Sequence, residues 1–243
     1  MFESVKIPKK LASSPINEVI FEIRYNGNYP EEALYGMLFD VFEPFPNKST
    51  AEFPMMQIPK MIRDNDPNLR YQALYRVAND KFAFSIGPHS IVFSALKPYP
   101  GWVAWSQFFN PILETIKSKS IIKDVERTGL RYFNILEGNI FDHINASLFL
   151  NESPVTASPS SFYTVFEQNG IYTILNVGNN AIINGNQTHD SLIDVDCIHR
   201  FECAAETFFS TYQAVLEKTH QVNEQVFFGL LKAELLNTFG PEY

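Results

Sequence analysis

Residues Asp124–Ile135 read DVERTGLRYFNI, and the rest of the fold is expected to form around them. Their side chains alternate with the period of a β-strand, with Leu130, Tyr132 and Asn134 on one side and Arg131, Phe133 and Ile135 on the other. Arg127 and Arg131 stand beside large apolar residues, and burying a guanidinium is costly unless a carboxylate pairs with it. The stretch therefore predicts a central strand that holds at least one internal ion pair.

The composition is that of an ordinary globular protein, with 243 residues for one large domain or two small ones. The net charge of −8 argues against generic binding to nucleic-acid backbones, because phosphate contacts need clustered lysine and arginine. Only two cysteines occur, which is typical of a reducing compartment. No stretch has the length of an apolar membrane helix or of a signal peptide. We therefore expect a soluble, cytoplasmic protein without membrane contact.

The segment Ile16–Tyr25 after Pro15 predicts another strand with one buried face. Its apolar side consists of Val19, Phe21, Ile23 and Tyr25. A helix is expected from about Pro30 to Phe42, because a proline and two glutamates open it and apolar residues follow at helical spacing.

An antiparallel meander and a helix are predicted next. Strand-like runs occur at residues 53–62, 70–77, 81–86 and 91–95. Pro54 and Pro59 limit the first run to an edge strand at best, since proline cannot donate a ladder hydrogen bond. Residues Trp102–Lys119 carry a helical stripe of apolar side chains that is suited to packing on the sheet.

The C-terminal part begins with strands and ends with helices. Asn169-Gly170 predicts a hairpin turn between strands at 162–166 and 171–177. The remaining expected elements are a second hairpin within Gly178–His189, a strand at Ser191–Ile198, a helix at Cys203–Lys218 and, after His220, a helix to about Leu236.

This order favours an α+β fold, mainly antiparallel sheet with helices packed on one face. The loop-rich segment 139–161 is the best candidate boundary between domains. We therefore expect an N-terminal α+β half at 1–138, a linker at 139–161 and a C-terminal half at 162–243. The two halves are candidates for related α+β units.

INEVIFEIRY and RTGLRYFN together resemble a sporadically distributed family of bacterial and archaeal proteins, about the size of this chain, whose function is not known. The family's opening motif is Pro-Pro-Ile-x-Glu-(Ala/Val)-(Val/Ile)-x-Glu-(Ile/Val)-Arg, and the matching residues are Pro15, Ile16, Glu18, Val19, Glu22, Ile23 and Arg24, with Ser14 in place of the first proline. The second motif, Arg-x-Gly-Leu-Arg-Tyr-x-Asn, is matched by Arg127, Gly129, Leu130, Arg131, Tyr132 and Asn134. The resemblance spans most of the chain, implies a fold of this type and supplies no catalytic residues.

A cluster of charged residues on two strands is the first candidate site. Glu18, Glu22 and Arg24 share one face of their strand, and Arg127 or Arg131 on a neighbouring strand would complete a Glu–Arg network. Such a network either grips a small anionic or zwitterionic ligand or serves as an internal ion-pair ladder that fixes strand register. The sequence leaves both interpretations open.

A metal site is the second candidate, because Asp194 and Asp196 share a face of their strand and His199 follows. A third firm ligand is missing, and the only further candidates are those nearby in sequence, His189, Asp190 and Glu202. No glycine-rich nucleotide loop, zinc motif or nucleophile elbow occurs, so no cofactor is indicated.

The last helix is apolar over more than one stripe, which is typical of either a partner interface or packing over the sheet. The candidate interface residues are Phe227, Phe228, Leu231, Leu235 and Phe239. We favour a non-enzymatic protein-interaction module that binds a partner or itself. The sporadic distribution of the family suggests an antitoxin-like, chaperone-like or accessory role in a defence or mobile-element locus. The alternatives are a small-ligand sensor at the Glu–Arg cluster and a metal-assisted enzyme at Asp194, Asp196 and His199.

Overall fold

The computed structural model describes residues 2, 5–38, 47–155, 159–180, 182–183, 186–187 and 190–243. The chain forms two compact units. Unit 1 consists of Met1–Glu18, Leu130–Ile198 and Glu217–Tyr243, and unit 2 consists of Val19–Gly129 and His199–Leu216. Each unit is built from separate segments, so neither coincides with the sequence-based ranges 1–138, 139–161 and 162–243. Both units combine mainly antiparallel sheet with helices, which confirms the α+β class.

The strands of unit 2 follow the order β14-β7-β2-β6-β5-β4-β3. They are β2 (Ile16–Gly27), β3 (Ser49–Glu52), β4 (Tyr75–Ala78), β5 (Phe82–Ile86), β6 (Ser90–Leu96), β7 (Ile122–Glu137) and β14 (Asp190–Ala204), of which β2, β7 and β14 also contribute to unit 1. Strands β3 to β6 pair antiparallel with their neighbours, which confirms the predicted meander over its later runs.

The strand predicted at 53–62 is wrong. These residues form a 3₁₀ turn, η1 (Pro54–Gln57), and begin helix α3 (Lys60–Asn65). Proline lacks an amide hydrogen and has a fixed φ, so Pro54 and Pro59 suit the first turn of a helix better than a sheet ladder. Helix α1 (Glu31–Met37) lies within its predicted range, and residues 39–42 of that prediction lie outside the described part of the chain.

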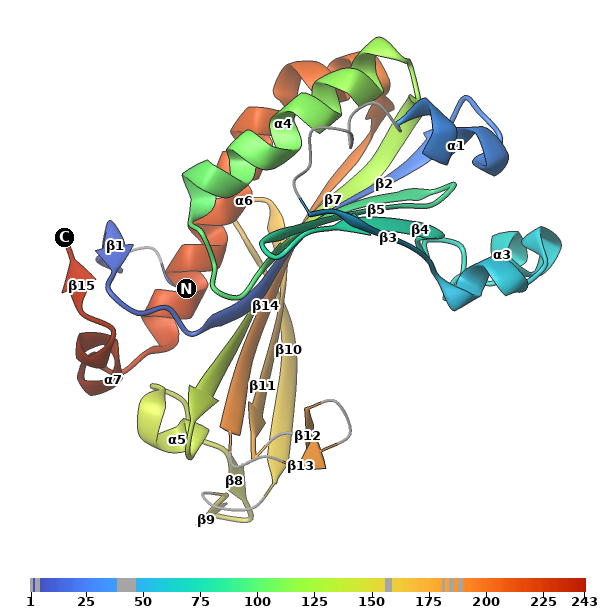
Figure 1. The fold of residues 1–243 in the computed structure, drawn as a ribbon. Coiled ribbons are helices and arrows are strands. Elements are labelled where there is room, and N and C mark those ends of the chain that lie inside the picture. Colours follow the sequence, from blue (N-terminus) through green and yellow to red (C-terminus); the bar gives the residue numbers. More distant parts are fainter. Residues whose placement is uncertain are drawn as a thin grey trace. The chain divides into compact units, whose positions relative to one another are not determined.

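The core of unit 2 lies between the sheet and helix α4 (Trp102–Ser118). Val19, Phe21, Ile23 and Tyr25 on β2 are buried, which confirms the predicted face. Phe109 of α4 contacts Phe21 with ring centroids 5.5 Å apart, and Figure 1 shows α4 in green. The strand alternation therefore leaves the other side chains of β2, including Glu22 and Arg24, on the opposite face of the sheet.

Helix α3 is joined to α1 by a buried ion pair. Arg63 donates from both terminal nitrogens to the carboxylate of Glu31, at 3.2 and 2.6 Å, and its Nε donates to the carbonyl of Ile58 at 2.9 Å. Both side chains are nearly inaccessible to solvent. Bidentate pairing with additional hydrogen bonds is the geometry that makes burial of a guanidinium tolerable.

The strands of unit 1 follow the order β10-β11-β14-β7-β2. Strands β10 (Ser160–Gln168) and β11 (Ile171–Asn179) form an antiparallel hairpin, as predicted from Asn169-Gly170, and both turn residues have positive φ. Three pairs of two-residue strands are also antiparallel: β1 (Lys10–Leu11) with β15 (Pro241–Glu242), β8 (Phe149–Leu150) with β9 (Ser153–Pro154) and β12 (Ile182–Ile183) with β13 (Asn186–Gln187). The last of these confirms the hairpin predicted within Gly178–His189.

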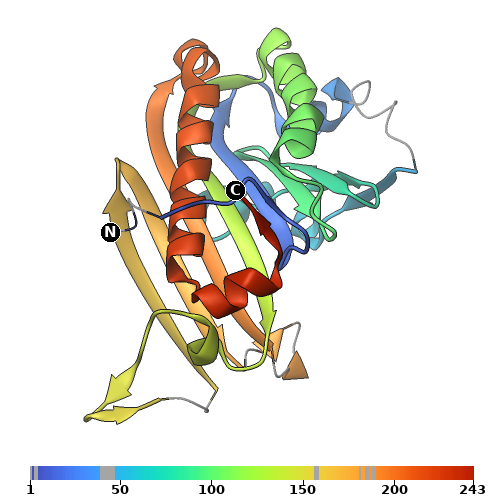
Figure 2. The same cartoon turned by 90° about the vertical axis from the view of Figure 1, so that its left-hand side faces the viewer.

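The C-terminal helices cover one face of the unit 1 strands, as Figure 2 shows. Helix α6 (Ala205–Leu230) is continuous, and α7 (Ala233–Thr238) follows it; α5 (Ile140–His143) is a single turn. The break predicted near His220 is therefore wrong, because no glycine or proline interrupts helix formation before Gly229. Within the described ranges, no helix is both long and apolar enough to cross a membrane.

Strand β7 confirms the central strand predicted from DVERTGLRYFNI. In unit 1 its buried positions, Leu130, Tyr132 and Asn134, alternate as expected. In unit 2 the period of two is interrupted, because Val125 and Thr128 are both buried although they are three residues apart. We call this interruption of the two-residue period a phase change. A β-bulge produces such a change and alters the direction in which the intervening side chains point.

Candidate functional site

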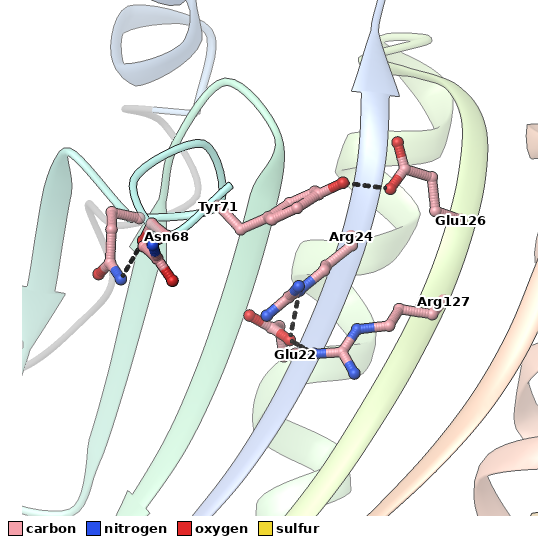
Figure 3. Close-up of polar contacts among 7 residues, drawn as sticks. Glu22, Arg24, Asn68, Tyr71, Glu126 and Arg127 are labelled. Carbon is pink, nitrogen blue, oxygen red and sulfur yellow. Dashed lines mark hydrogen bonds and ion pairs between the residues drawn. The ribbon is translucent and has the colours of Figure 1, made fainter. Parts of the chain in front are cut away.

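The polar face of unit 2 carries the charged residues of β2 and β7. Figure 3 shows Glu126 and Arg127, which are neighbours in sequence, both reaching side chains on this face. In a regular strand consecutive side chains point to opposite faces. The phase change between Val125 and Thr128 therefore brings an acidic and a basic residue to one site.

Glu22 is shared by two arginines. Its Oε2 accepts a hydrogen bond from Nε of Arg24 at 3.0 Å and another from Nη2 of Arg127 at 3.0 Å, as Figure 3 shows. All three side chains are about a quarter exposed. Nε of Arg127 is buried and has no hydrogen-bond partner among the described residues. One carboxylate thus serves two guanidinium groups, and this trio carries one net positive charge.

Tyr71 forms a second wall of the site. Its hydroxyl donates to Oε2 of Glu126 at 2.6 Å, and its ring lies 4.2 Å from the guanidinium carbon of Arg24. Burial, together with the hydrogen bond and charge of Glu126, raises the pKa of Tyr71 above its ordinary value. The phenol therefore stays protonated as a donor at neutral pH. Cation–π contact holds the Arg24 side chain against the ring.

The segment that carries Tyr71 follows α3 and approaches the β5–β6 turn closely. The backbone of Leu74 donates to the carbonyl of Ile86 at 2.9 Å. A Cβ on Gly87 would lie only 2.5 Å from the carbonyl oxygen of Gln72, so only glycine fits at this position without displacing the segment. The close contact at Gly87 therefore sets the distance between this segment and the sheet.

A pocket of about 460 Å³ lies between this segment and the sheet. Its polar lining residues are Glu22, Arg24, Asn68, Tyr71, Gln72 and Ser85, and its apolar ones are Phe53, Pro67, Ala73 and Val92. Small-molecule sites generally have volumes of roughly 300–1,000 Å³ and combine apolar walls with a few polar groups. The pocket thus has the size and lining of a site for a small ligand with a charged group.

Asn26 and Arg70 extend the polar network away from the pocket. Nδ2 of Asn26 donates to Asp124 at 2.7 Å, and Nη2 of Arg70 donates to Oδ1 of Asn26 at 3.2 Å. Arg70 also lies 3.8 Å from Glu126. Asp124 and Glu126 therefore interact with Asn26 and Arg70. Glu22 is the carboxylate that binds Arg24.

The five residues predicted as one ligand site are divided between the two units. Glu22, Arg24 and Arg127 come together in unit 2 as described above. Glu18 and Arg131 belong to unit 1. There Arg131 makes two hydrogen bonds, from Nε to Oδ1 and from Nη2 to Oδ2 of Asp194, at 2.7 and 2.6 Å. These bonds, with the charges of Asp196 and Glu18, raise the pKa of Arg131.

Sequence reasoning missed the residues that come from the loop after α3. Tyr71 and Gln72 lie in the run 70–77, which the pattern predicts as a strand, and Asn68 lies between the two predicted runs 53–62 and 70–77. Glu126 lies in the quoted stretch, but the alternation pattern assigned it no partner. The Asp66-Pro67 pair, which favours turn initiation, is a local clue that a loop passes here.

The residues of the predicted metal site have other surroundings. Both carboxylate oxygens of Asp194 accept hydrogen bonds from Arg131. The His199 ring packs on Phe201 with centroids 4.6 Å apart in unit 2, whereas Asp194 and Asp196 belong to unit 1. In the part of the chain that the structure describes, no group of three or more His, Cys, Asp or Glu residues could hold a metal; His189 lies outside that part.

The residues predicted as a partner interface contribute to the core of unit 1. Phe227 and Leu231 are buried in it, and Phe228, Leu235 and Phe239 are partly buried against it. Packing over the sheet therefore accounts for the apolar width of this segment. Whether the exposed parts of these side chains also bind a partner stays a prediction.

A buried histidine and a carboxyl group lie together on α6 in unit 1. Nδ1 of His220 is 3.1 Å from the Tyr132 hydroxyl, and its Nε2 is 3.5 Å from Oε1 of Glu224. Burial lowers the pKa of His220 from 6.5 to about 4. Burial, reinforced by the charge of Glu217, raises the pKa of Glu224 from 4.5 to about 7.

The two shifts act on stability in opposite directions. The contribution of His220 is present above pH 6.5 and is lost as the pH falls through about 4, because the unfolded chain binds the proton more readily. The contribution of Glu224 is present below pH 4.5 and is lost as the pH rises through about 7, because the folded chain binds the proton more readily.

In comparisons with protein-family models and with curated proteins, no family model and no curated protein matches this chain. The function must therefore be argued from the site itself.

Proposed function

We propose that unit 2 binds a small ligand with a carboxylate or phosphate group in the pocket beside Arg24 and Tyr71. The observation that carries this proposal is the sharing of one Glu22 oxygen by Arg24 and Arg127. Within this trio two guanidinium groups share one carboxylate, so an anion next to Arg24 would compensate the second guanidinium, although Asp124, Glu126 and Arg70 make the wider cluster neutral. An anion in the pocket supplies that compensation at the end where Arg24 stands.

The Nε of Arg127, which has no hydrogen-bond partner within the described ranges, supports the same function. A buried donor without a partner costs about 1–3 kcal/mol, and more when it belongs to a charged group. Such strain is commonly retained where a ligand relieves it. An anion that attracts Arg24 away from Glu22 would leave the Glu22 carboxylate to Arg127 and let the Arg127 side chain reorient. The amides of Asn68 and Gln72 and the hydroxyl of Ser85 then offer hydrogen bonds that orient the rest of the ligand.

The experiment is isothermal titration of the purified chain with inorganic phosphate, glutamate, benzoate and adenosine monophosphate. The variant Arg24→Gln should lower the affinity of any binder by at least about tenfold, because a charge-assisted hydrogen bond contributes about 1.5–3 kcal/mol. Lys81→Gln is the matched control, since it removes one positive charge from an exposed turn of the same unit. Equal losses in both variants would show a general charge effect, and no binding by any of the four probes would count against the site.

Protein interaction is the second candidate function, and the exposed apolar side chains on the outer strands of unit 1 favour it. Tyr163 and Tyr172 each expose about half or more of their surface. An antitoxin-like, chaperone-like or accessory role in a defence or mobile-element locus is the biological form that the family resemblance implies. Affinity purification from the native host followed by native mass spectrometry tests it, because a bound partner would appear at a fixed stoichiometry.

A further inference from the structure

Strand β10 is an edge strand that lacks the usual protection against pairing. Among the strands that the structure describes, it pairs only with β11, so its outer side presents backbone donors and acceptors. Natural edge strands are protected by lysine, proline, bulges or short length. Residues 160–168, SSFYTVFEQ, run for nine residues without lysine, arginine or proline, and Glu167 is their single charge.

The side chains on the outer face of this hairpin are unusually apolar for an exposed surface. Tyr163, Val165 and Tyr172 are 66%, 41% and 47% exposed. Val165 lies opposite Ile174 in the β10–β11 ladder, and Tyr172 lies opposite Glu167. An apolar strip that adjoins an unpaired sheet edge is the pattern used for strand addition.

From this edge we infer that two copies of the chain associate by antiparallel pairing of β10 with β10, with the two-fold axis at Thr164. Thr164 is the middle residue of Ser160–Gln168, so this register alone pairs all nine residues of both strands. The inference names a partner for the protein-interaction role, on which it rests, and it is independent of the ligand pocket.

The side chains of β10 are complementary to themselves in this register. Tyr163 faces Val165 of the second copy, and Phe162 faces Phe166, so aromatic residues meet β-branched or aromatic ones on both faces. Thr164 of one copy lies opposite Thr164 of the other copy, which allows a threonine–threonine contact. Each Glu167 faces Ser161, so no like charges are opposed. A shift that centres the pair on Glu167 would oppose two carboxylates and leave most of the strand unpaired.

The ends of β10 supply an independent reason for a second strand. The hydroxyl oxygen of Ser160 is buried and has no hydrogen-bond partner among the described residues. In the inferred register Ser160 faces Gln168 of the second copy. The Gln168 amide donates to Gln225 and accepts from the backbone of Phe2, which leaves one N–H and one lone pair available. Pairing therefore offers a partner to a group that is unsatisfied within the described part of the single chain.

The axis at Thr164 also explains why a second copy is the fitting occupant. An isologous contact requires that one patch be complementary to itself under two-fold rotation, and β10 meets that requirement in pattern, charge and length. An unrelated strand would need no symmetry about Thr164.

Two charge variants test the inference directly, because Thr164 is exposed and is not part of the unit 1 core. Thr164→Lys and Thr164→Glu each oppose like charges across the axis, so each variant should sediment as a monomer at concentrations where the parent chain is dimeric. An equimolar mixture of the two variants should form a heterodimer, because opposite charges then meet. Circular dichroism checks that both variants are folded.

Disulfide formation provides a second test that does not depend on charge. In the inferred register the two Thr164 Cα atoms are about 4.5–5.5 Å apart, within the range that a disulfide spans. Thr164→Cys should therefore crosslink under mild oxidation. Ser161→Cys is the matched control, because its two copies are separated by six strand positions, about 20 Å. Both are made in a Cys203→Ser background, since Cys203 is partly exposed.

The outcomes are decisive in either direction. A parent dimer, monomeric charge variants that associate on mixing, and crosslinking at position 164 alone would establish the pairing. A parent chain that stays monomeric, charge variants that dimerise as the parent does, or equal crosslinking at positions 161 and 164 would overturn it. Such a result leaves host-partner capture as the separate test of the protein-interaction role.

Discussion

Substitution of Arg131 by alanine should destabilise unit 1 because it strands a buried carboxylate. Arg131 gives Asp194 two hydrogen bonds, at 2.7 and 2.6 Å. The Asp194 side chain is 9% exposed, whereas the Arg131 side chain is 44% exposed. Removal of a partner from a fully buried pair costs about 3–5 kcal/mol, and an exposed pair contributes under about 1 kcal/mol.

The magnitude follows from this uneven exposure. Truncation of Arg131 opens a path for water to the Asp194 oxygens, which restores part of their hydration. We therefore expect a loss of about 2–3 kcal/mol, between the two limits. For a chain of this length the corresponding fall in melting temperature is about 5–10 °C. The loss should depend on the charge of Asp194 and not on the volume of the missing side chain.

Urea unfolding of four chains separates charge from volume. The parent chain is compared with Arg131→Ala, Asp194→Asn and the double variant, each followed by far-ultraviolet circular dichroism. Asp194→Asn should cost about 1 kcal/mol, because the exposed guanidinium can turn to water. The double variant should be more stable than Arg131→Ala alone, because the amide carries no charge to strand.

Two results would refute the reasoning. A loss below about 1 kcal/mol for Arg131→Ala would mean that the pair behaves as an exposed ion pair. A double variant no more stable than Arg131→Ala would mean that side-chain packing, and not the buried charge, causes the loss.

Three further predictions concern other parts of the molecule. Between pH 4.5 and 6.5 the effects of His220 and Glu224 on the free energy of unfolding should nearly cancel. In Glu224→Gln only the effect of His220 remains, so the free energy of unfolding should rise by about 2 kcal/mol over this range relative to the parent. Urea unfolding at several pH values measures it, and the same pH dependence in both chains would contradict the assigned pKa values. Gly87→Ala should cost about 1–3 kcal/mol and weaken ligand binding, since its Cβ would press on the Gln72 carbonyl; calorimetry checks both, and unchanged binding would show that this contact does not shape the pocket. Arg63→Ala should cost about 3–5 kcal/mol, more than Arg131→Ala, because its carboxylate partner on α1 is shielded as well; a smaller loss in thermal melts would contradict this ranking.

The strands with regular alternation could be predicted from sequence because their signal is local. Val19, Phe21 and Ile23 repeat at a period of two, and one face of such a strand must be buried whatever lies against it. Asn169-Gly170 likewise predicted its hairpin, because few residues other than Asn and Gly adopt two successive positive φ values easily. Fold class followed from these elements and their order.

The candidate site could be predicted only in part. Glu22 and Arg24 were found because they share a strand face, and Arg127 because a central strand was expected to bring a partner. The alternation pattern gave no reason to place Glu126 on the same face as Arg127, since a phase change in a strand leaves no regular signal. Tyr71 was missed because it reaches the site from a loop.

The sequence by itself determined which segments become strands, which of their faces are buried and that an arginine on the central strand needs a carboxylate. It did not determine which carboxylate. Arg131 pairs with Asp194, 63 positions further along the chain, and Arg127 pairs with Glu22, 105 positions back. Periodicity and turn signals act over a few residues, whereas strand order and register bring distant residues together. Only the tertiary structure therefore decided that one cluster is a closed ion pair and that the other lines a pocket.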